Sequence, residues 1–170
     1  MIKDFLDKKV KIDPSVYISK GVIIIGDVEI GKGSSVWFGS IIRGDTEKIK
    51  IGEYTNLQDY VIVHTDKGFL LEIGNYVTIG HRAIIHGCQI RDYVMIGMGA
   101  IILNGAVINK NVIVAAGSVV KENFVVPENT LVAGIPAEIK RELNEKDIQM
   151  IKNASEHYYR LAQIYKDYEI

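Results

Sequence analysis

The sequence lacks several features that would each point to a particular class of protein. It has one cysteine, Cys88, so no disulfide can form within the chain. No apolar run reaches the roughly 18–20 residues that span a bilayer, and the first residues lack the basic and then apolar layout of a secretory signal. Twenty lysines and arginines balance 21 aspartates and glutamates, so charge gives no reason to expect nucleic acid or a membrane as a partner. We expect a cytoplasmic protein.

What the sequence does have is a repeat of six residues with three changes of phase. The aliphatic positions that follow it are Ile12, Ile18, Ile24, Ile30, Val36, Ile42, Ile51, Leu57, Val63, Ile73, Ile79, Ile85, Ile90, Ile96, Ile102, Ile108, Val114 and Val120. A period of six cannot form one stripe on a helix, but it is a multiple of the strand period of two. Three sixes therefore make one coil of a parallel solenoid, in which each strand pairs with its equivalent one coil later. The phase changes are insertions of three residues around 44–48 and four around 66–69, and one deletion near Gly87.

The repeat weakens after Val120, and the C-terminal residues follow a helical pattern. From about Asn144, apolar residues recur at spacings of three and four, and Asn144 with Asp147 is typical of a capping pair. We predict an all-β solenoid over residues 1–138. A helical segment over residues 139–170 then packs on the solenoid wall or on a neighbouring subunit.

Three of the four histidines fall at related positions of the predicted coils. His64 and His86 each follow a third-side aliphatic residue by one, and they are separated by 22 residues, which is one coil plus the four-residue insertion. They should therefore stack on one edge, about 4.8 Å apart, where two imidazoles can bind one ion. His81 follows a second-side residue by two and lies near a different edge. It can complete the same site only from a neighbouring subunit, which predicts a trimer with sites between subunits.

A charged pair obeys the same arithmetic. Arg43 lies in the row of His64 and His86, and Asp59 lies in the row of His81. If these rows meet between subunits, Arg43 of one should pair with Asp59 of the next and hold the register of the interface.

The ligand set indicates the metal. Three neutral histidines with an open fourth position are typical of catalytic Zn2+, which lowers the pKa of a bound water to about 7. Fe2+ or Co2+ would suit the same ligands. Cys88 is close to His86 in sequence, but we expect it to be a buried packing residue.

Several segments resemble the gamma-class carbonic anhydrases of the hexapeptide-repeat family. They are Trp37 to Asp45, Asn56 to Asp59, Val63 with His64, Gly80 to Cys88, and Gly134 to Ala137. The resemblance implies a left-handed parallel β-helix, a homotrimer, and metal-dependent reversible hydration of CO2 to bicarbonate.

The resemblance also implies roles for individual residues. His64, His81 and His86 would bind the metal. Gln58 would hydrogen-bond the hydroxide or the substrate, and Asn56 would orient CO2. Asp45 would join these two as a catalytic residue, and Arg43 and Asp59 would support the interface.

The sequence departs from the family at the acidic loop that relays the proton. Thr46 follows Asp45, and the loop after His64 is short, which leaves Asp66 or Glu47 as the nearest acids. Two alternatives therefore stay open beside a lyase. One is a hexapeptide acyl-CoA transferase, which needs one histidine as general base and an acceptor-binding extension. The other is a trimeric metal-binding scaffold with little catalysis.

Overall fold

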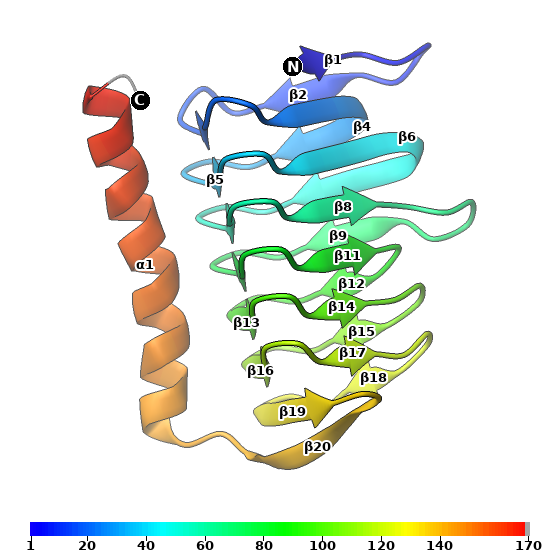
Figure 1. Ribbon diagram of the computed structural model, residues 1–170, viewed down its shortest axis with the longest axis vertical. Helices are drawn as coiled ribbons and strands as arrows, with labels where there is room; N and C mark the ends of the chain where they lie inside the picture. Colours follow the sequence, from blue (N-terminus) through cyan, green and yellow to red (C-terminus); the bar gives the residue numbers. More distant parts are fainter. Residues whose placement is uncertain (169–170) are drawn as a thin grey trace.

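The computed structural model describes residues 1–168, which form a parallel β-solenoid with one long helix along its side (Figure 1). In Figure 1 the chain runs left to right along the strands nearest the viewer and returns behind them as it descends, so the coil is left-handed. The predicted fold class is confirmed. The helix is not apolar enough to cross a membrane, and no other helix occurs in the described residues.

The solenoid has three faces, each a stack of short parallel strands. The first, here called the charged face, contains β2 (Val10–Ile12), β9 (Leu71–Ile73), β12 (Gln89–Ile90), β15 (Val107–Ile108) and β18 (Val125–Val126), with the second halves of β4 (Ile23–Ile30) and β6 (Ile41–Ile51). The second, the helix-side face, contains β3 (Tyr17–Ile18), β5 (Ser35–Val36), β7 (Asn56–Leu57), β10 (Thr78–Ile79), β13 (Val94–Ile96), β16 (Val112–Val114) and β19 (Thr130–Gly134). The third, the aliphatic face, contains β1 (Ile2–Lys3), the first halves of β4 and β6, β8 (Ile62–His64), β11 (Ile84–His86), β14 (Ile101–Ile102) and β17 (Val119–Val120).

The register follows the predicted repeat. Ile42 pairs with Val63, Val63 with Ile85, and Ile85 with Ile102, which are steps of 21, 22 and 17 residues. Each step differs from 18 by the predicted insertion or deletion. All repeat positions are buried except Ile12 and Ile18 in the first coil, which are partly buried, so these side chains form the core.

The C-terminal helix α1 (Glu145–Asp167) packs on the wall of its own solenoid. It contacts strands of the helix-side face, where Trp37 and Tyr17 form a buried cluster with Ala162. Asn144 caps the helix and exchanges hydrogen bonds with Asp147, so the predicted capping pair is confirmed. Before the helix, β20 (Ala137–Glu142) pairs antiparallel with β19, so the boundary we placed at residue 138 falls within a strand.

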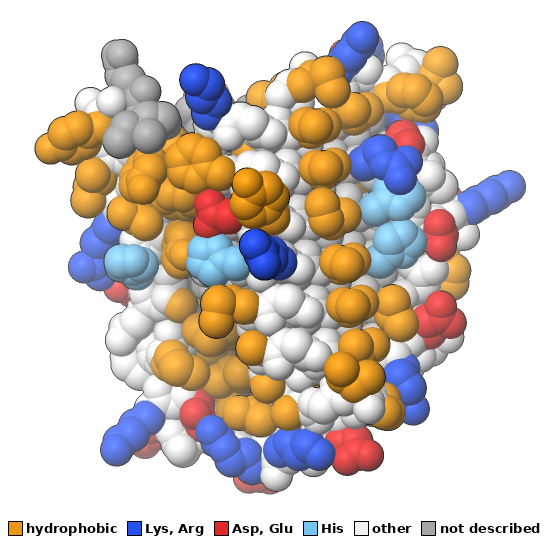
Figure 2. Space-filling model, in the orientation of Figure 1, with side chains coloured by type: hydrophobic (Ala, Val, Ile, Leu, Met, Phe, Trp, Pro, Cys, Tyr) orange, Lys and Arg blue, Asp and Glu red, His pale blue; other side chains and the backbone are white. Residues whose placement is uncertain are grey.

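The outward side chains differ from face to face. On the charged face Lys11, Glu29, Lys50 and Glu72 are successive cross-strand neighbours of alternating sign. The corresponding row on the aliphatic face is Ile23, Ile41, Ile62, Ile84, Ile101 and Val119, all partly or fully exposed. Figure 2 shows hydrophobic side chains along this face. A contiguous exposed row of aliphatic side chains is the kind of surface that marks interaction sites.

Candidate metal centre

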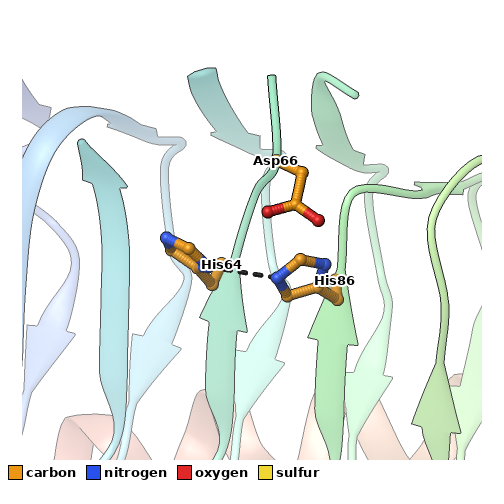
Figure 3. A group of neighbouring side chains, drawn as sticks. All are labelled: His64, Asp66 and His86. Carbon is orange, nitrogen blue, oxygen red and sulfur yellow. Dashed lines mark hydrogen bonds between the residues drawn. The ribbon is translucent and has the colours of Figure 1, made fainter. Parts of the chain in front are cut away.

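His64 and His86 stack at one edge of the aliphatic face, as predicted. Each is the last residue of its strand, and the two residues pair directly in the sheet. His64 Nδ1 lies 3.1 Å from His86 Nε2, and the ring centroids are 5.1 Å apart (Figure 3). The strand spacing thus brings two ring nitrogens to one point.

The opposite ring nitrogens each have an oxygen partner. His64 Nε2 lies 3.2 Å from Asp45 Oδ1, and His86 Nδ1 lies 2.7 Å from Asn104 Oδ1. A carboxylate or amide oxygen accepts a hydrogen bond and so places the ring proton on its own side. The two nitrogens that face each other then both carry lone pairs, which repel at 3.1 Å unless a cation or a proton lies between them. This arrangement fits a metal, because metal-binding histidines usually donate their other N–H to such an acceptor.

Electrostatics favours the metal-binding form of His64. Partial burial and the nearby Arg43 guanidinium lower the pKa of His64, although Asp45 acts in the opposite direction. The imidazole is therefore more often neutral at a given pH, and neutral imidazole is the form that binds metals.

A carboxylate completes the cluster within the protomer. The ligand atoms of His64, Asp66 and His86 lie within 4.8 Å of one another. Asn104 connects two of them, because its Nδ2 donates to Asp66 Oδ2 at 2.9 Å while its Oδ1 accepts from His86. Sequence reasoning missed Asn104. Counting by coils would not have found it, since this coil is 17 residues long and Asn104 lies one residue beyond the register position of His86.

Among the residues that the structure describes, His81 lies apart from this cluster. Its Nδ1 is 2.7 Å from Asp59 Oδ2, and its Nε2 is 3.4 Å from the hydroxyl of Tyr158 on α1. The Asp59 carboxylate again fixes the ring proton and leaves the other nitrogen with its lone pair. Histidine side chains lie at both edges of the face in Figure 2. All three predicted ligands thus have the same local arrangement, but one protomer brings only two of them together.

The two buried amides lie beside His81 rather than beside His64. Gln58 Oε1 accepts a hydrogen bond from the backbone N–H of His81 at 3.1 Å, and Gln58 Nε2 donates to Asn56 Oδ1 at 3.4 Å. Asn56 in turn donates to Thr78 Oγ1 at 2.9 Å. The predicted site residues therefore form two groups, one at each edge.

The two members of the predicted charged pair each have another contact within the protomer. Arg43 forms an ion pair with Asp45, and Asp59 contacts His81. The pairing of Arg43 with Asp59 between subunits therefore stays a prediction.

Cys88 is buried, and burial raises the pKa of its thiol to about 12, so it stays protonated at neutral pH and is not a ligand.

Comparison with known proteins identifies the family. The model of the family described as bacterial transferase hexapeptide (six repeats) matches residues 87–122. A probable carbonic anhydrase of Methanocaldococcus jannaschii is 51% identical over 158 residues, which cover 93% of this chain and 99% of that protein. Gamma carbonic anhydrase 2 of Arabidopsis thaliana mitochondria is 42% identical and covers 96% of this chain and 61% of that longer protein. The chain belongs to the gamma carbonic anhydrase family.

A solved structure with the same fold carries a different name. It is a putative acetyltransferase of Bacillus cereus, with a TM-score of 0.94 and 39% identity, covering 98% of this chain and 96% of that one. Gamma carbonic anhydrases and proteins named for acyl transfer thus share one fold. The reaction must be inferred from the site and not from the fold.

Proposed function

We propose that this protein catalyses the reversible hydration of CO2 to bicarbonate, with a divalent metal bound between the subunits of a homotrimer. The observation that carries the proposal is the 3.1 Å approach of two histidine nitrogens whose protons are held on the opposite sides of the rings. Relatives named carbonic anhydrase support CO2 as the substrate. Zn2+ is the metal we propose, and Fe2+ or Co2+ suits the same ligands.

The residues of this chain would hold the metal and direct its ligands. When bound, the metal acts as a Lewis acid that makes a hydroxide nucleophile available near neutral pH. Asp45 and Asn104 keep the lone pairs of His64 and His86 pointing toward one another, and Asp59 orients His81 in the same way.

Two buried amides are suited to position the substrate. Gln58 is anchored by the backbone of His81, and Asn56 is anchored by Thr78, so neither side chain is free to rotate. In the assembled site the second N–H of the Gln58 amide would donate a hydrogen bond to CO2 and to the forming bicarbonate. Asn56 directs its own N–H groups to Thr78 Oγ1 and the Val77 carbonyl, and it would hold Gln58 in place through its Oδ1. Such fixed donors are effective because they need no reorganisation during the reaction.

The aliphatic face supports the trimer. The row from Ile23 to Val119 runs between the edge of His64 and the edge of His81, so subunits that cover this row would bring opposite edges together. Contiguous exposed apolar surface of this kind marks interaction sites in soluble proteins. In this arrangement His81 of one subunit completes the pair on the next.

Metal analysis and stopped-flow CO2 hydration test the proposal. We expect the zinc- or iron-loaded protein to hydrate CO2 and His86→Ala to lose both metal and activity. His157→Ala is the matched control, because His157 is exposed on α1. A loaded protein that binds metal at the histidines but does not hydrate CO2 would instead support the scaffold.

Acyl transfer is the second candidate, favoured by the likeness to a putative acetyltransferase. That reaction needs a single histidine base, and it gives no reason for three histidines each backed by an oxygen acceptor. Turnover of acetyl-CoA that survives removal of the metal by a chelator would favour it over hydration.

A further inference from the structure

Asp66 has an arrangement that a three-histidine site does not require. It lies in the loop that follows β8, and its side chain is exposed. Even so, Figure 3 shows its carboxylate turned toward the two imidazole rings, and its oxygen lies within 4.8 Å of the ligand nitrogens of His64 and His86. An exposed aspartate directed only by solvent would have no reason to point there.

The loop that carries Asp66 is held in place. The backbone N–H of Phe69 donates to the Asp66 carbonyl at 3.0 Å and closes a turn. The backbone N–H of Gly68 donates to Glu47 Oε1 at 3.0 Å, which ties the loop to the preceding coil. The four-residue insertion therefore presents Asp66 from a fixed backbone, which is what a metal ligand needs.

Asn104 aims the carboxylate. It donates to Asp66 Oδ2 at 2.9 Å and accepts from His86 Nδ1 at 2.7 Å, so one amide orients both groups. Among the described residues, only Oδ2 of this carboxylate has a hydrogen-bond partner, and Oδ1 is available to a cation. Metal-binding histidines and carboxylates are both usually hydrogen-bonded to a supporting residue of this kind.

We infer that Asp66 is a ligand of the metal, so that His64, Asp66 and His86 hold a divalent cation within a single protomer. Two imidazole nitrogens and one carboxylate oxygen form a set with open positions that suits Fe2+ and Co2+. The carboxylate also neutralises one of the two positive charges of the cation, whereas three neutral histidines would neutralise neither. A protomer would thus bind its metal before assembly, and His81 of the neighbouring subunit would join it afterwards. The inference rests on the proposed function for the location of the metal, but not for the reaction.

Binding of Co2+ to the full-length protein tests this inference. Affinity is measured by competition with a chelator, and the visible absorption of Co2+ reports its coordination. We expect Asp66→Asn to weaken Co2+ binding about tenfold or more and to change the spectrum, because a ligand is removed. Asp7→Asn is the matched control, since Asp7 is exposed and distant in sequence, and it should change neither.

A second variant separates this inference from the proposed function. His81→Ala should still bind Co2+, and the double variant of His81→Ala with Asp66→Asn should bind it more weakly than either single variant. Asp66→Asn with wild-type affinity and spectrum would overturn the role of Asp66 and leave the three-histidine site standing. If His86→Ala binds Co2+ as well as wild type, both proposals fail, because the metal is then bound elsewhere.

Discussion

Hydrogen bonds to ring nitrogens determine what each histidine of this protein can do. His64, His86 and His81 each direct one nitrogen to an oxygen of their own chain, from Asp45, Asn104 and Asp59 respectively. The oxygen acceptor fixes which nitrogen keeps its lone pair and also fixes the ring plane. The side chains behind the ligands therefore matter as much as the ligands.

The first prediction concerns Asn104. Asn104→Ala should lower metal affinity about 10- to 100-fold, because His86 loses the acceptor that orients it and Asp66 loses its donor. Asn153→Ala is a suitable control, since Asn153 is an exposed residue of α1. Chelator competition measures the affinity of both variants. An unchanged affinity in Asn104→Ala would mean that His86 is oriented by its strand alone.

In the candidate metal centre, residue positions could be predicted from the sequence only where the repeat applies. His64 and His86 lie inside strands, so counting residues placed them in one row, and the sheet pairs them directly. Asp66 lies in an insertion, where the chain leaves the period of two and side-chain direction cannot be counted. Its approach to His86 depends on a turn and on contact with Asn104, 38 residues away.

At the scale of elements, the helix is positioned by its capped N-terminal end and by its buried face. The capping pair was readable from local sequence because Asn144 and Asp147 lie three residues apart. The extension of β20 to Glu142 was not, because it pairs antiparallel with β19 and has no counterpart in the parallel repeat. The sequence also left open whether the helix covers its own solenoid or a neighbouring subunit. The buried cluster around Trp37 shows that it packs on its own solenoid.

The second prediction is a dependence of stability on pH at the start of α1. Hydrogen bonds from Arg141 and from the backbone N–H of Asn144 lower the pKa of Asp147 to about 2. Aspartate in an unfolded chain titrates near 3.9, so the unfolded state takes up a proton first as the pH falls. The contribution of Asp147 to stability is therefore complete above about pH 4 and is lost as the pH falls toward about 2.

Urea unfolding at a series of pH values measures this contribution. Asp147→Asn should be less stable than wild type at pH 7, and the difference should shrink as the pH falls from about 4 to about 2. Glu145→Gln is the control, because Glu145 is also acidic and in the first turn but is exposed. A difference between Asp147→Asn and wild type that stays constant with pH would show that shape, and not charge, is what matters at this position.

At the scale of the whole molecule, the three faces have different outer surfaces although one repeat builds them all. Inward positions are set by the core and were predictable from the sequence, whereas the outward positions depend on what covers each face. The charged face has alternating lysine and glutamate, and α1 covers the helix-side face. The aliphatic face has neither, and its edges carry the two halves of the proposed site.

The third prediction tests that face as the subunit interface. Ile84→Asp should dissociate the trimer in sedimentation experiments, because an exposed isoleucine in the middle of the row becomes a charge that assembly would bury. Val125→Asp introduces the same charge at an exposed aliphatic position of the charged face and should leave the assembly unchanged. Equal effects of the two substitutions would contradict the assignment of the interface.

The last prediction asks whether one functional site needs two subunits. His64→Ala and His81→Ala should each lack CO2 hydration alone, because the first removes a ligand from the stacked pair and the second removes the ligand supplied by the neighbour. In randomly mixed trimers, a His81→Ala subunit still offers His64 and His86, and a His64→Ala subunit still offers His81. With two kinds of subunit in equal amounts, about a quarter of the interfaces would combine the intact halves, and activity should recover to about that fraction.

A mixture of His64→Ala with His86→Ala is the control, because both variants damage the same half and no interface can regain all three histidines. Recovery in neither mixture would place the complete site within one chain, and His81 would then have to reach His64 and His86 by a rearrangement of its own protomer.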